Sequence, residues 1–378
     1  MNYTLSHLVS LLMIISGFLV STRSTAQEKV IDLGQHWEDK GDYPLSKLGN
    51  SIEYIPLETT PACVIGPAYK YQYKLIRDTI YLTGQEHPIY VFDRHGKFVR
   101  TIGFVGQGPG EFTEITSYAI NQNNNTIWIS NRQLGKILIY TTSGVFVQEF
   151  KGWQGSYILF NNSDGGVSCF FRSFRQEASN NEIKEFGIDS MIVNRIPLYH
   201  VENYVEHRKY VRRSTISVLN RELSIIELPS LEEHILREGV WNPGWKFTSG
   251  SGDIIKIRQS QNHLFIQCAN PIVHQFIVEK GSGNIFICSF GINAMGPDLV
   301  GAFNDLDGGL SFWPKFITAD GDLVCMYEAY DLISFANGQT SSWGGKPPKM
   351  SDEFRDFTKK LSIDDNPVIA IVRQNESE

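Results

Sequence analysis

Residues 76–112, IRDTIYLTGQEHPIYVFDRHGKFVRTIGFVGQGPGEF, set a pattern that the rest of the chain repeats. Turn residues divide this stretch into short runs rich in β-branched and aromatic side chains, which favour strands. The runs are residues 79–83, 89–93 and 98–103. The turn before the last run ends in Gly96, which can take the positive φ that a tight hairpin needs. The stretch therefore predicts consecutive antiparallel strands joined by short turns.

The repeat lies directly downstream. Residues 138–150 (LIYTTSGVFVQEF) align with residues 90–102 (YVFDRHGKFVRTI) at an offset of 48, which places Gly144 on Gly96. A four-strand unit that recurs about every 40 to 50 residues is typical of a β-propeller blade. Four clear units and two degraded ones predict an all-β fold, a six-bladed β-propeller of four-stranded antiparallel blades. Seven blades are the alternative.

The two ends of the chain supply candidate closing strands, residues 52–57 and 368–373. In a ring of blades, a strand from one terminus commonly joins a sheet from the other, because closure removes the open edge. We therefore expect these two segments to pair. Residues 232–245 are expected to form a short helix and a loop. Residues 351–361 (SDEFRDFTKKL) predict an amphipathic helix that begins after Ser351.

Residues 1–26 have the pattern of an export signal. The apolar core, residues 8–20, is shorter than the roughly 20 helical residues that span a bilayer, and the small residues 24–26 (STA) suit a cleavage site. A buried N-terminal helix or strand is the alternative. The first cysteine is Cys63, so the sequence predicts no lipid anchor. We expect the mature chain, residues 27–378, to be a single domain in the periplasm or outside the cell, with no membrane span.

Charge and cysteine content narrow the classes of partner. The chain carries 34 Lys and Arg against 41 Asp and Glu, a net charge of −7, which argues against a nucleic-acid partner because such a partner needs a basic stripe. The five cysteines are scattered and lack zinc-site spacing, so we interpret them as small apolar side chains. The sequence predicts no metal site and no cofactor.

Three motifs carry a resemblance to known proteins. YVFDRHGKFVRTIGFVGQGPGEF, residues 90–112, resembles the NHL-type repeat, in which a strand ending in Phe-Asp is followed by a Gly turn and a Gly-rich link. The chain is also similar to exported bacterial six-bladed β-propeller proteins of unassigned function. The shared motifs are IEYIPLE at residues 52–58, GQGPGE at 106–111 and DNP at 365–367. The resemblance implies a propeller fold and export, and it supplies no catalytic residues.

Binding residues are expected at the mouth of the central channel. Turns between the second and third strands of each blade share one face of a propeller with the links between blades, and loops on a rigid scaffold often carry binding residues. The candidate ligand-binding residues are Glu86, His87, Gln107, Glu111, Arg132, Gln133, Trp153, Arg172 and Asn270. Mixed charge with aromatic groups suits a sugar or a peptide. For each residue, a solvated loop or blade packing is the alternative.

The sequence favours a binding protein over an enzyme. It has no GxSxG and no HExxH motif, and the Gly-rich residues 106–111 precede a strand, so no helix N-terminus is available there for a phosphate. We expect an exported, non-catalytic propeller whose funnel receives a glycan, a peptide or a protein partner. The alternative is an NHL-like lyase or hydrolase that uses the same funnel. Such an enzyme could be metal-dependent if the ring brought His87, His95, His263 and His274 together as metal ligands.

Overall fold

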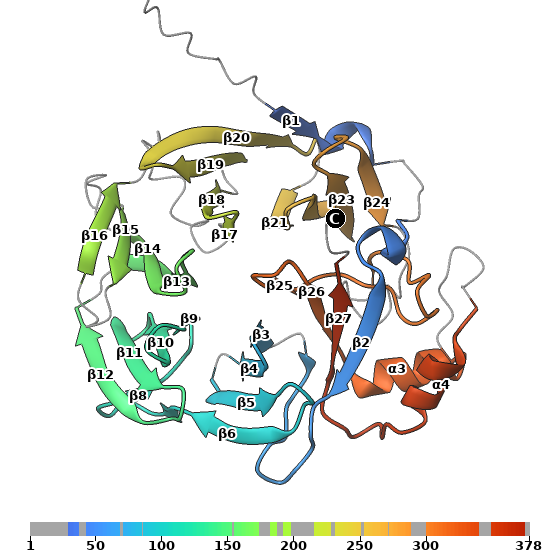
Figure 1. Cartoon of the computed structure of the whole chain (residues 1–378), viewed down its shortest axis with the longest axis horizontal. Coiled ribbons are helices and arrows are strands. Elements are labelled where there is room, and N and C mark those ends of the chain that lie inside the picture. The colour runs from blue at the N-terminus through green and yellow to red at the C-terminus, as the bar shows by residue number, and fades with distance from the viewer. Residues whose placement is uncertain are drawn as a thin grey trace, which may run out of the picture.

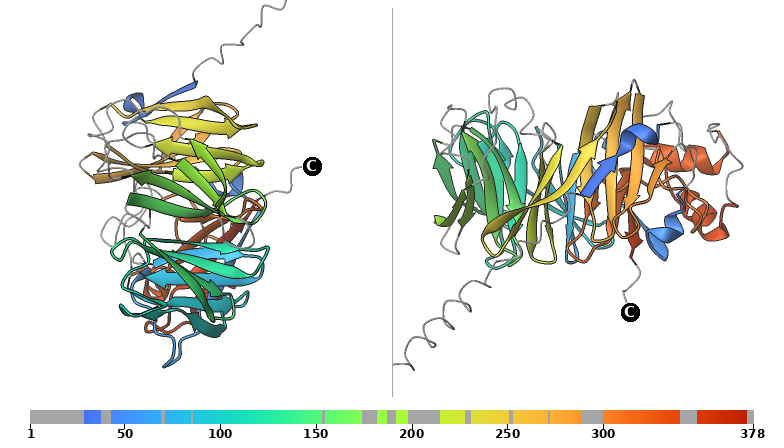
Figure 2. Two further views of the ribbon diagram at one scale, coloured as in Figure 1. Left: turned by 90° about the vertical axis from the view of Figure 1, so that its left-hand side faces the viewer. Right: turned by 90° about the horizontal axis from the view of Figure 1, so that it is seen from above.

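The protein is a ring of six β-sheets in the computed structural model, with the sheets standing as blades around one axis (Figures 1 and 2). The described strands form these six blades and one small two-stranded sheet, so the prediction of an all-β, six-bladed propeller is confirmed. The structure describes residues 29–37, 43–68, 71–84, 86–152, 155–173, 182–186, 192–197, 215–227, 231–250, 253–270, 272–288, 300–339 and 349–374. The predicted export signal, residues 1–26, lies outside these ranges.

Blades 1 to 3 follow the chain in order, each with its strands paired consecutively. Blade 1 consists of β3 (Tyr71–Ile76), β4 (Thr79–Gly84), β5 (Ile89–Asp93) and β6 (Phe98–Ile102). Blade 2 consists of β9 (Ser117–Asn121), β10 (Thr126–Asn131), β11 (Lys136–Thr141) and β12 (Phe146–Lys151). Blade 3 consists of β13 (Gly155–Asn161), β14 (Val167–Ser173), β15 (Glu182–Phe186) and β16 (Ile192–Pro197). A small parallel pair, β7 (Phe104–Val105) and β8 (Glu111–Phe112), lies in the link between blades 1 and 2.

Blades 4 and 6 each contain a strand from the N-terminal segment, and blade 5 is formed from four consecutive strands. Blade 4 consists of β17 (Thr215–Leu219), β18 (Glu222–Glu227), β19 (Glu232–Arg237) and β20 (Val240–Thr248), with β1 (Lys29–Asp32) as a fifth strand. Blade 5 consists of β21 (Asp253–Gln259), β22 (His263–Asn270), β23 (Ile272–Glu279) and β24 (Ile285–Cys288). Blade 6 consists of β25 (Phe316–Ile317), β26 (Leu323–Tyr327), β27 (Val368–Arg373) and β2 (Ser51–Pro56).

The ring closes in blade 6, where a strand from each end of the described chain meets. β2 pairs antiparallel with β27, from Ser51 opposite Arg373 to Pro56 opposite Val368. This confirms the predicted pairing of residues 52–57 with residues 368–373. Figure 1 shows β2 as the outermost strand of this blade, between the ring and the helices α3 (Ala329–Ala336) and α4 (Asp352–Thr358).

The order of strands in each blade gives the ring two different faces. The first strand of each blade is the innermost in Figure 1, and successive strands step outward. Because neighbouring strands are antiparallel, turns between second and third strands emerge on the same side as the links between blades. We call that side the link face. Turns between first and second strands, and between third and fourth strands, emerge on the opposite side, the hairpin face.

Apolar side chains between neighbouring blades form the core. Because side chains alternate along a strand, each blade presents an apolar surface to both neighbours. Trp128 of blade 2 packs in one cluster with Leu159 of blade 3, and Ile89 of blade 1 packs in another with Tyr118 of blade 2. The cysteines are buried free thiols within this core, in agreement with their interpretation as small apolar side chains: Cys63, Cys169, Cys268, Cys288 and Cys325.

The predicted C-terminal helix is present. The hydroxyl of Ser351 accepts a hydrogen bond from the backbone N–H of Phe354 at 3.0 Å, which caps α4 as the sequence indicates. Phe354 is buried, and Phe357 stacks on Tyr54 of β2 with ring centroids 5.2 Å apart. The apolar face of this helix therefore covers the outside of the closing blade.

The prediction of a helix and loop over residues 232–245 is wrong, because this segment forms β19 and most of β20. A two-residue turn, Glu238–Gly239, joins the two strands, and both turn residues have positive φ. Pro243 has no backbone N–H to donate to a neighbouring strand. β1 pairs only with residues 245–248 of β20, so no strand lies beside Pro243 on the outer edge of β20 and no hydrogen bond is lost there.

Two short 3-10 helices complete the described N-terminal segment: η1 (Leu33–Gln35) and η2 (Leu45–Lys47). The described helices are all too short, or too polar, to cross a bilayer.

Candidate functional site

Glu86 and His87 form the turn between β4 and β5 on the link face, as predicted, and both side chains are exposed. The turn is held from within, because the hydroxyl of Thr83 donates to the backbone carbonyl of His87 at 3.2 Å. The imidazole of His87 lies beside Tyr71 of the innermost strand, with ring centroids 5.6 Å apart. This turn therefore presents an acid and an imidazole from a supported backbone.

Arg132 and Gln133 occupy the equivalent turn of blade 2, between β10 and β11. The carboxylate of Glu114, from the link that precedes β9, accepts a hydrogen bond from the backbone N–H of Gln133 at 3.1 Å. The same oxygen lies 3.9 Å from Nε of Arg132. A link residue thus holds the neighbouring turn, which agrees with links and turns sharing one face.

Gln107 and Glu111 lie in the link between blades 1 and 2, where the glycines have a packing role. The Glu111 carboxylate accepts a hydrogen bond from the backbone N–H of Gly108 at 2.8 Å, and a Cβ at Gly106 would overlap that carboxylate at 2.1 Å. Gly110 packs on Phe146 of β12, so this link lies against the outer strands of blade 2. Gln107 is exposed there, and its role in ligand binding remains a prediction.

The other three candidates are only partly described. Trp153 lies outside the described residues. Arg172 is within β14, paired with Ser156, rather than in the loop that follows, and Asn270 is the last residue of β22, paired with Ile272. The side chains of Arg172 and Asn270 are also outside what the structure describes, so their backbones alone place them toward the link face.

The four histidines considered as metal ligands lie in different parts of the ring. His87 is in the β4–β5 turn, His95 is in the β5–β6 turn on the opposite face, and His274 is on β23 beside Trp37. His263 accepts or donates a hydrogen bond at Nε2 with the hydroxyl of Tyr43, 3.0 Å away, and its burial lowers its pKa. Across the described ranges, no three His, Cys, Asp or Glu side chains are grouped as a metal site requires.

A lysine near the channel was missed by sequence reasoning. Lys74 is on β3, the innermost strand of blade 1, and its ammonium lies 5.0 Å from the ring centroid of Tyr118 on β9. Burial lowers the pKa of Lys74 to about 8. The alternation of YQYKLI, residues 71–76, places Lys74 on the side of the strand that faces blade 2, which is the sequence signal for it.

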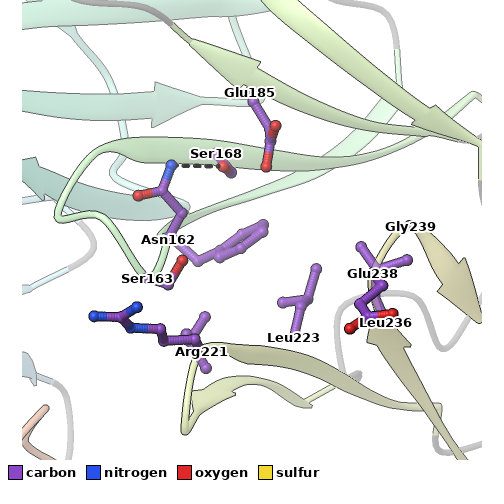
Figure 3. Close-up of a pocket in the computed structure, with 11 residues that line it drawn as sticks. Asn162, Ser163, Ser168, Glu185, Arg221, Leu223, Leu236, Glu238 and Gly239 are labelled. Carbon is purple, nitrogen blue, oxygen red and sulfur yellow. Dashed lines mark hydrogen bonds between the residues drawn. The ribbon is translucent and has the colours of Figure 1, made fainter.

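A pocket on the hairpin face was also missed (Figure 3). It lies between blades 3 and 4, on the opposite side of the ring from the predicted mouth residues. Arg221 and Glu238, at the tips of the two hairpins of blade 4, stand at its edge. The two-residue gaps between strands, Asn220–Arg221 and Glu238–Gly239, are the sequence signal for these tips.

Solved structures similar to this chain share its fold. A candidate exported protein from Bacteroides fragilis is 14% identical, with a TM-score of 0.64, and the match covers 92% of this chain and all of that one. Two others have TM-scores too low to carry an argument. Virginiamycin B lyase from Staphylococcus aureus is 15% identical (TM-score 0.40, 67% of this chain and 77% of that chain), and a Bacteroides caccae protein of unknown function is 12% identical (0.39, 65% and 81%).

No curated protein matches the chain. A family model does match it, over residues 28–228, which is more than half of the sequence and includes the strands from β1 to β18. That family is described as a domain of unknown function. The chain belongs to this family, DUF4934.

Proposed function

We propose that the protein is an exported binding propeller that uses its link face, around the mouth of the channel, to hold a glycan, a peptide or a protein partner, with no chemistry of its own. The observation that carries the proposal is the placement of Glu86–His87 and Arg132–Gln133 at equivalent turns of adjacent blades. Each pair is fixed by contacts from within the scaffold, through Thr83 and Glu114. Fixed backbones lower the entropy lost when a ligand binds.

Export is supported by the signal-like residues 1–26 and by the candidate exported protein from Bacteroides fragilis that shares the fold. The mixed charge of the two turns supports a polar ligand, because an acid, an imidazole and a guanidinium together can pair with hydroxyl, amide and carboxylate groups. Gln107, Glu111, Trp153, Arg172 and Asn270 are proposed as further contacts on the same face.

The test is a binding screen of residues 27–378 against glycan and peptide arrays, repeated with Glu86→Ala, His87→Ala and Arg132→Ala combined. We expect at least one class of ligand to bind, and the triple variant to weaken that binding by about tenfold or more, as loss of a few central contacts does. The matched control is Arg94→Ala with His95→Ala, two exposed residues of the β5–β6 turn on the hairpin face. Equal binding by the wild type, the triple variant and the control would contradict the proposal.

A further inference from the structure

The pocket between blades 3 and 4 is a second place where the ring has the features of a binding site (Figure 3). Its volume is about 170 Å³, close to that of an engineered cavity that binds benzene, and it opens to solvent, so it can hold one side chain of a ligand whose polar groups remain at the edge. Blade 3 supplies β14 and the β13–β14 turn, and blade 4 supplies the tips of both of its hairpins. The site is therefore formed by two separate rigid elements.

Apolar side chains line one part of the pocket, here called its floor, and Asn162, Ser163 and Ser168 line another part. Phe160 of β13 is 8% exposed, and Leu223 and Leu236, which pair across β18 and β19, are half-buried. Figure 3 shows Leu223 standing between the two hairpin-tip charges. An apolar group of a ligand that covers this floor removes its surface, and its own, from water.

Arg221 and Glu238 are unusual residues for the turns that hold them. Asn220 and Arg221 have φ of 50° and 66°, and Glu238 and Gly239 have φ of 49° and 79°. Two-residue turns with positive φ throughout prefer Asn and Gly, because other side chains strain the backbone. In the described part of the chain, neither Arg221 nor Glu238 forms an ion pair that would offset this strain. Arg77 of blade 1 shares this conformation, so what distinguishes Arg221 and Glu238 is their position at the edge of the pocket.

The charges have opposite signs on either side of the apolar floor. Figure 3 shows the guanidinium of Arg221 on one side of Leu223 and the carboxylate of Glu238 on the other. Glu185 of β15 adds a second carboxylate, which accepts a hydrogen bond from Asn194 at 2.8 Å. A guanidinium recognises a carboxylate, and a carboxylate recognises an ammonium group. The pocket therefore matches a molecule with separated, opposite charges and an apolar group between them.

We propose that this pocket binds a short peptide with free termini, of about dipeptide size and with an apolar side chain. Its carboxylate pairs with Arg221, its ammonium group pairs with Glu238, and its apolar side chain lies on Leu223 and Phe160. A free amino acid carries both charged groups on one carbon, so these groups lie closer together than the two termini of a dipeptide. A sugar is a poorer match, because the lining contains a single aromatic ring, Phe160, which is too buried to serve as a stacking surface.

The ligand is tested by calorimetric titration of the purified protein with the dipeptide Ala-Leu. We expect binding, and we expect N-acetyl-Ala-Leu, Ala-Leu amide and free leucine each to bind about tenfold or more weakly, because each lacks one charge-assisted contact or the required separation. No binding of Ala-Leu at millimolar concentration would overturn the proposal. Equal binding of Ala-Leu and its two blocked forms would also overturn it, because the termini would then have no role.

The variant Arg221→Gly separates binding from folding. Glycine adopts the positive φ of this turn without strain, so the midpoint of thermal unfolding stays the same or rises while Ala-Leu binding falls about tenfold or more. The matched control is Arg77→Gly, which makes the same change at φ 52° in the β3–β4 turn of blade 1, away from the pocket. Arg77→Gly leaves Ala-Leu binding unchanged. Equal loss in both variants, or no loss in Arg221→Gly, would contradict the assignment.

This site and the proposed link-face site fail independently. The combined Glu86→Ala, His87→Ala and Arg132→Ala variant is expected to bind Ala-Leu as the wild type does, since those residues lie on the opposite face of the ring. A loss of Ala-Leu binding in that variant would place the dipeptide at the channel mouth and overturn the pocket proposal.

Discussion

The N-terminal segment supplies two strands to the ring, and these strands have different structural roles. β2 completes blade 6, where it pairs antiparallel with β27 through six residue pairs. β1 adds to blade 4, which already has four strands, and pairs parallel with the end of β20 through four residue pairs. Without β2 the closing blade has three strands and the ring has an open seam. Without β1, blade 4 is still a complete blade.

The contacts of the two strands agree with this difference. Arg373 at the end of β27 pairs with Glu53 of β2 at 2.9 Å and also with Asp322. Ion pairs as well as backbone hydrogen bonds therefore stabilise the pairing of β2 with β27, which we call the seam. β1 instead turns one side chain, Ile31, into the core between blades 4 and 5 and leaves Val30 54% exposed. β1 covers an edge that would otherwise be open to pairing with another chain. One terminus thus both closes the ring and protects a blade.

The largest expected effect comes from a cavity at the seam. Ile371 on β27 is 1% exposed and packs in the cluster between blades 6 and 1. Ile371→Ala is expected to lower the free energy of unfolding by about 2–5 kcal/mol, because it removes buried methyl groups and leaves a cavity in a strand that cannot detach alone. Urea denaturation followed by circular dichroism measures this loss.

The matched variant for the comparison is Ile31→Ala on β1, which is 3% exposed. The same side-chain change in β1 is expected to lower the free energy of unfolding by less, because β1 can separate from β20 while the rest of blade 4 stays folded. The destabilisation therefore cannot exceed the free energy of that local separation. Equal losses in the two variants would mean that β1 is as necessary to the ring as β27.

A smaller effect is expected at Asn366, which ties the loop after β2 to the start of β27. Its side chain is 2% exposed, accepts a hydrogen bond from the N–H of Ile65 at 2.8 Å, and donates to the carbonyls of Glu58 and Cys63 at 2.7 and 2.9 Å. Asn366→Ala leaves these buried backbone groups without partners and is expected to cost about 1–3 kcal/mol. Thermal or urea unfolding measures it. A loss below about 0.5 kcal/mol would show that water replaces the amide.

The closing strand that contains Ile371 and the buried side chain of Asn366 show which parts of the fold the sequence could predict. The repeat around Gly96 and Gly144 predicts blades, and the apolar run of residues 368–373 predicts a closing strand, because both signals are local. The Asp-Asn-Pro motif was recognised only by resemblance, and its reason became visible with the fold: Asn366 satisfies backbone groups some 300 residues away in the chain. Contacts at that separation leave no local pattern.

The candidate sites show the same limit. The turns that carry Glu86 and Arg132 were predicted, since their place in a blade follows from strand order. The pocket beside Arg221 was not, because it depends on how blade 3 and blade 4 stand relative to each other. The position of β1 was not predicted either. Its four residues resemble any short strand, and their parallel partner in β20 is more than 200 residues away.

The smallest expected effect is a pH-dependent loosening of β1 alone. The carboxylate of Asp32 accepts hydrogen bonds from the hydroxyl of Thr248 at 2.8 Å and from the N–H of Gly34 at 2.9 Å, and these bonds, that of Thr248 first, lower its pKa. Because the pKa is lower in the folded protein than in the unfolded chain, this stabilisation is complete above the unfolded value of about 3.9 and is lost as the pH falls through the folded value.

Hydrogen exchange of backbone amides measures this loosening. In the wild type, protection in β1 and in the residues of β20 that pair with it is expected to fall below about pH 4. The variant Asp32→Asn keeps an acceptor for Thr248 but does not titrate, so its protection in β1 should not change over the same range. Amides of the β2–β27 seam serve as the internal reference, since Asp32 does not contact them and their protection should be the same in both proteins. If β1 loosened equally in the variant, a group other than Asp32 would control the docking of this strand. If the seam loosened together with β1, the two strands would form one cooperative unit, and the separation between closing strand and added strand would fail.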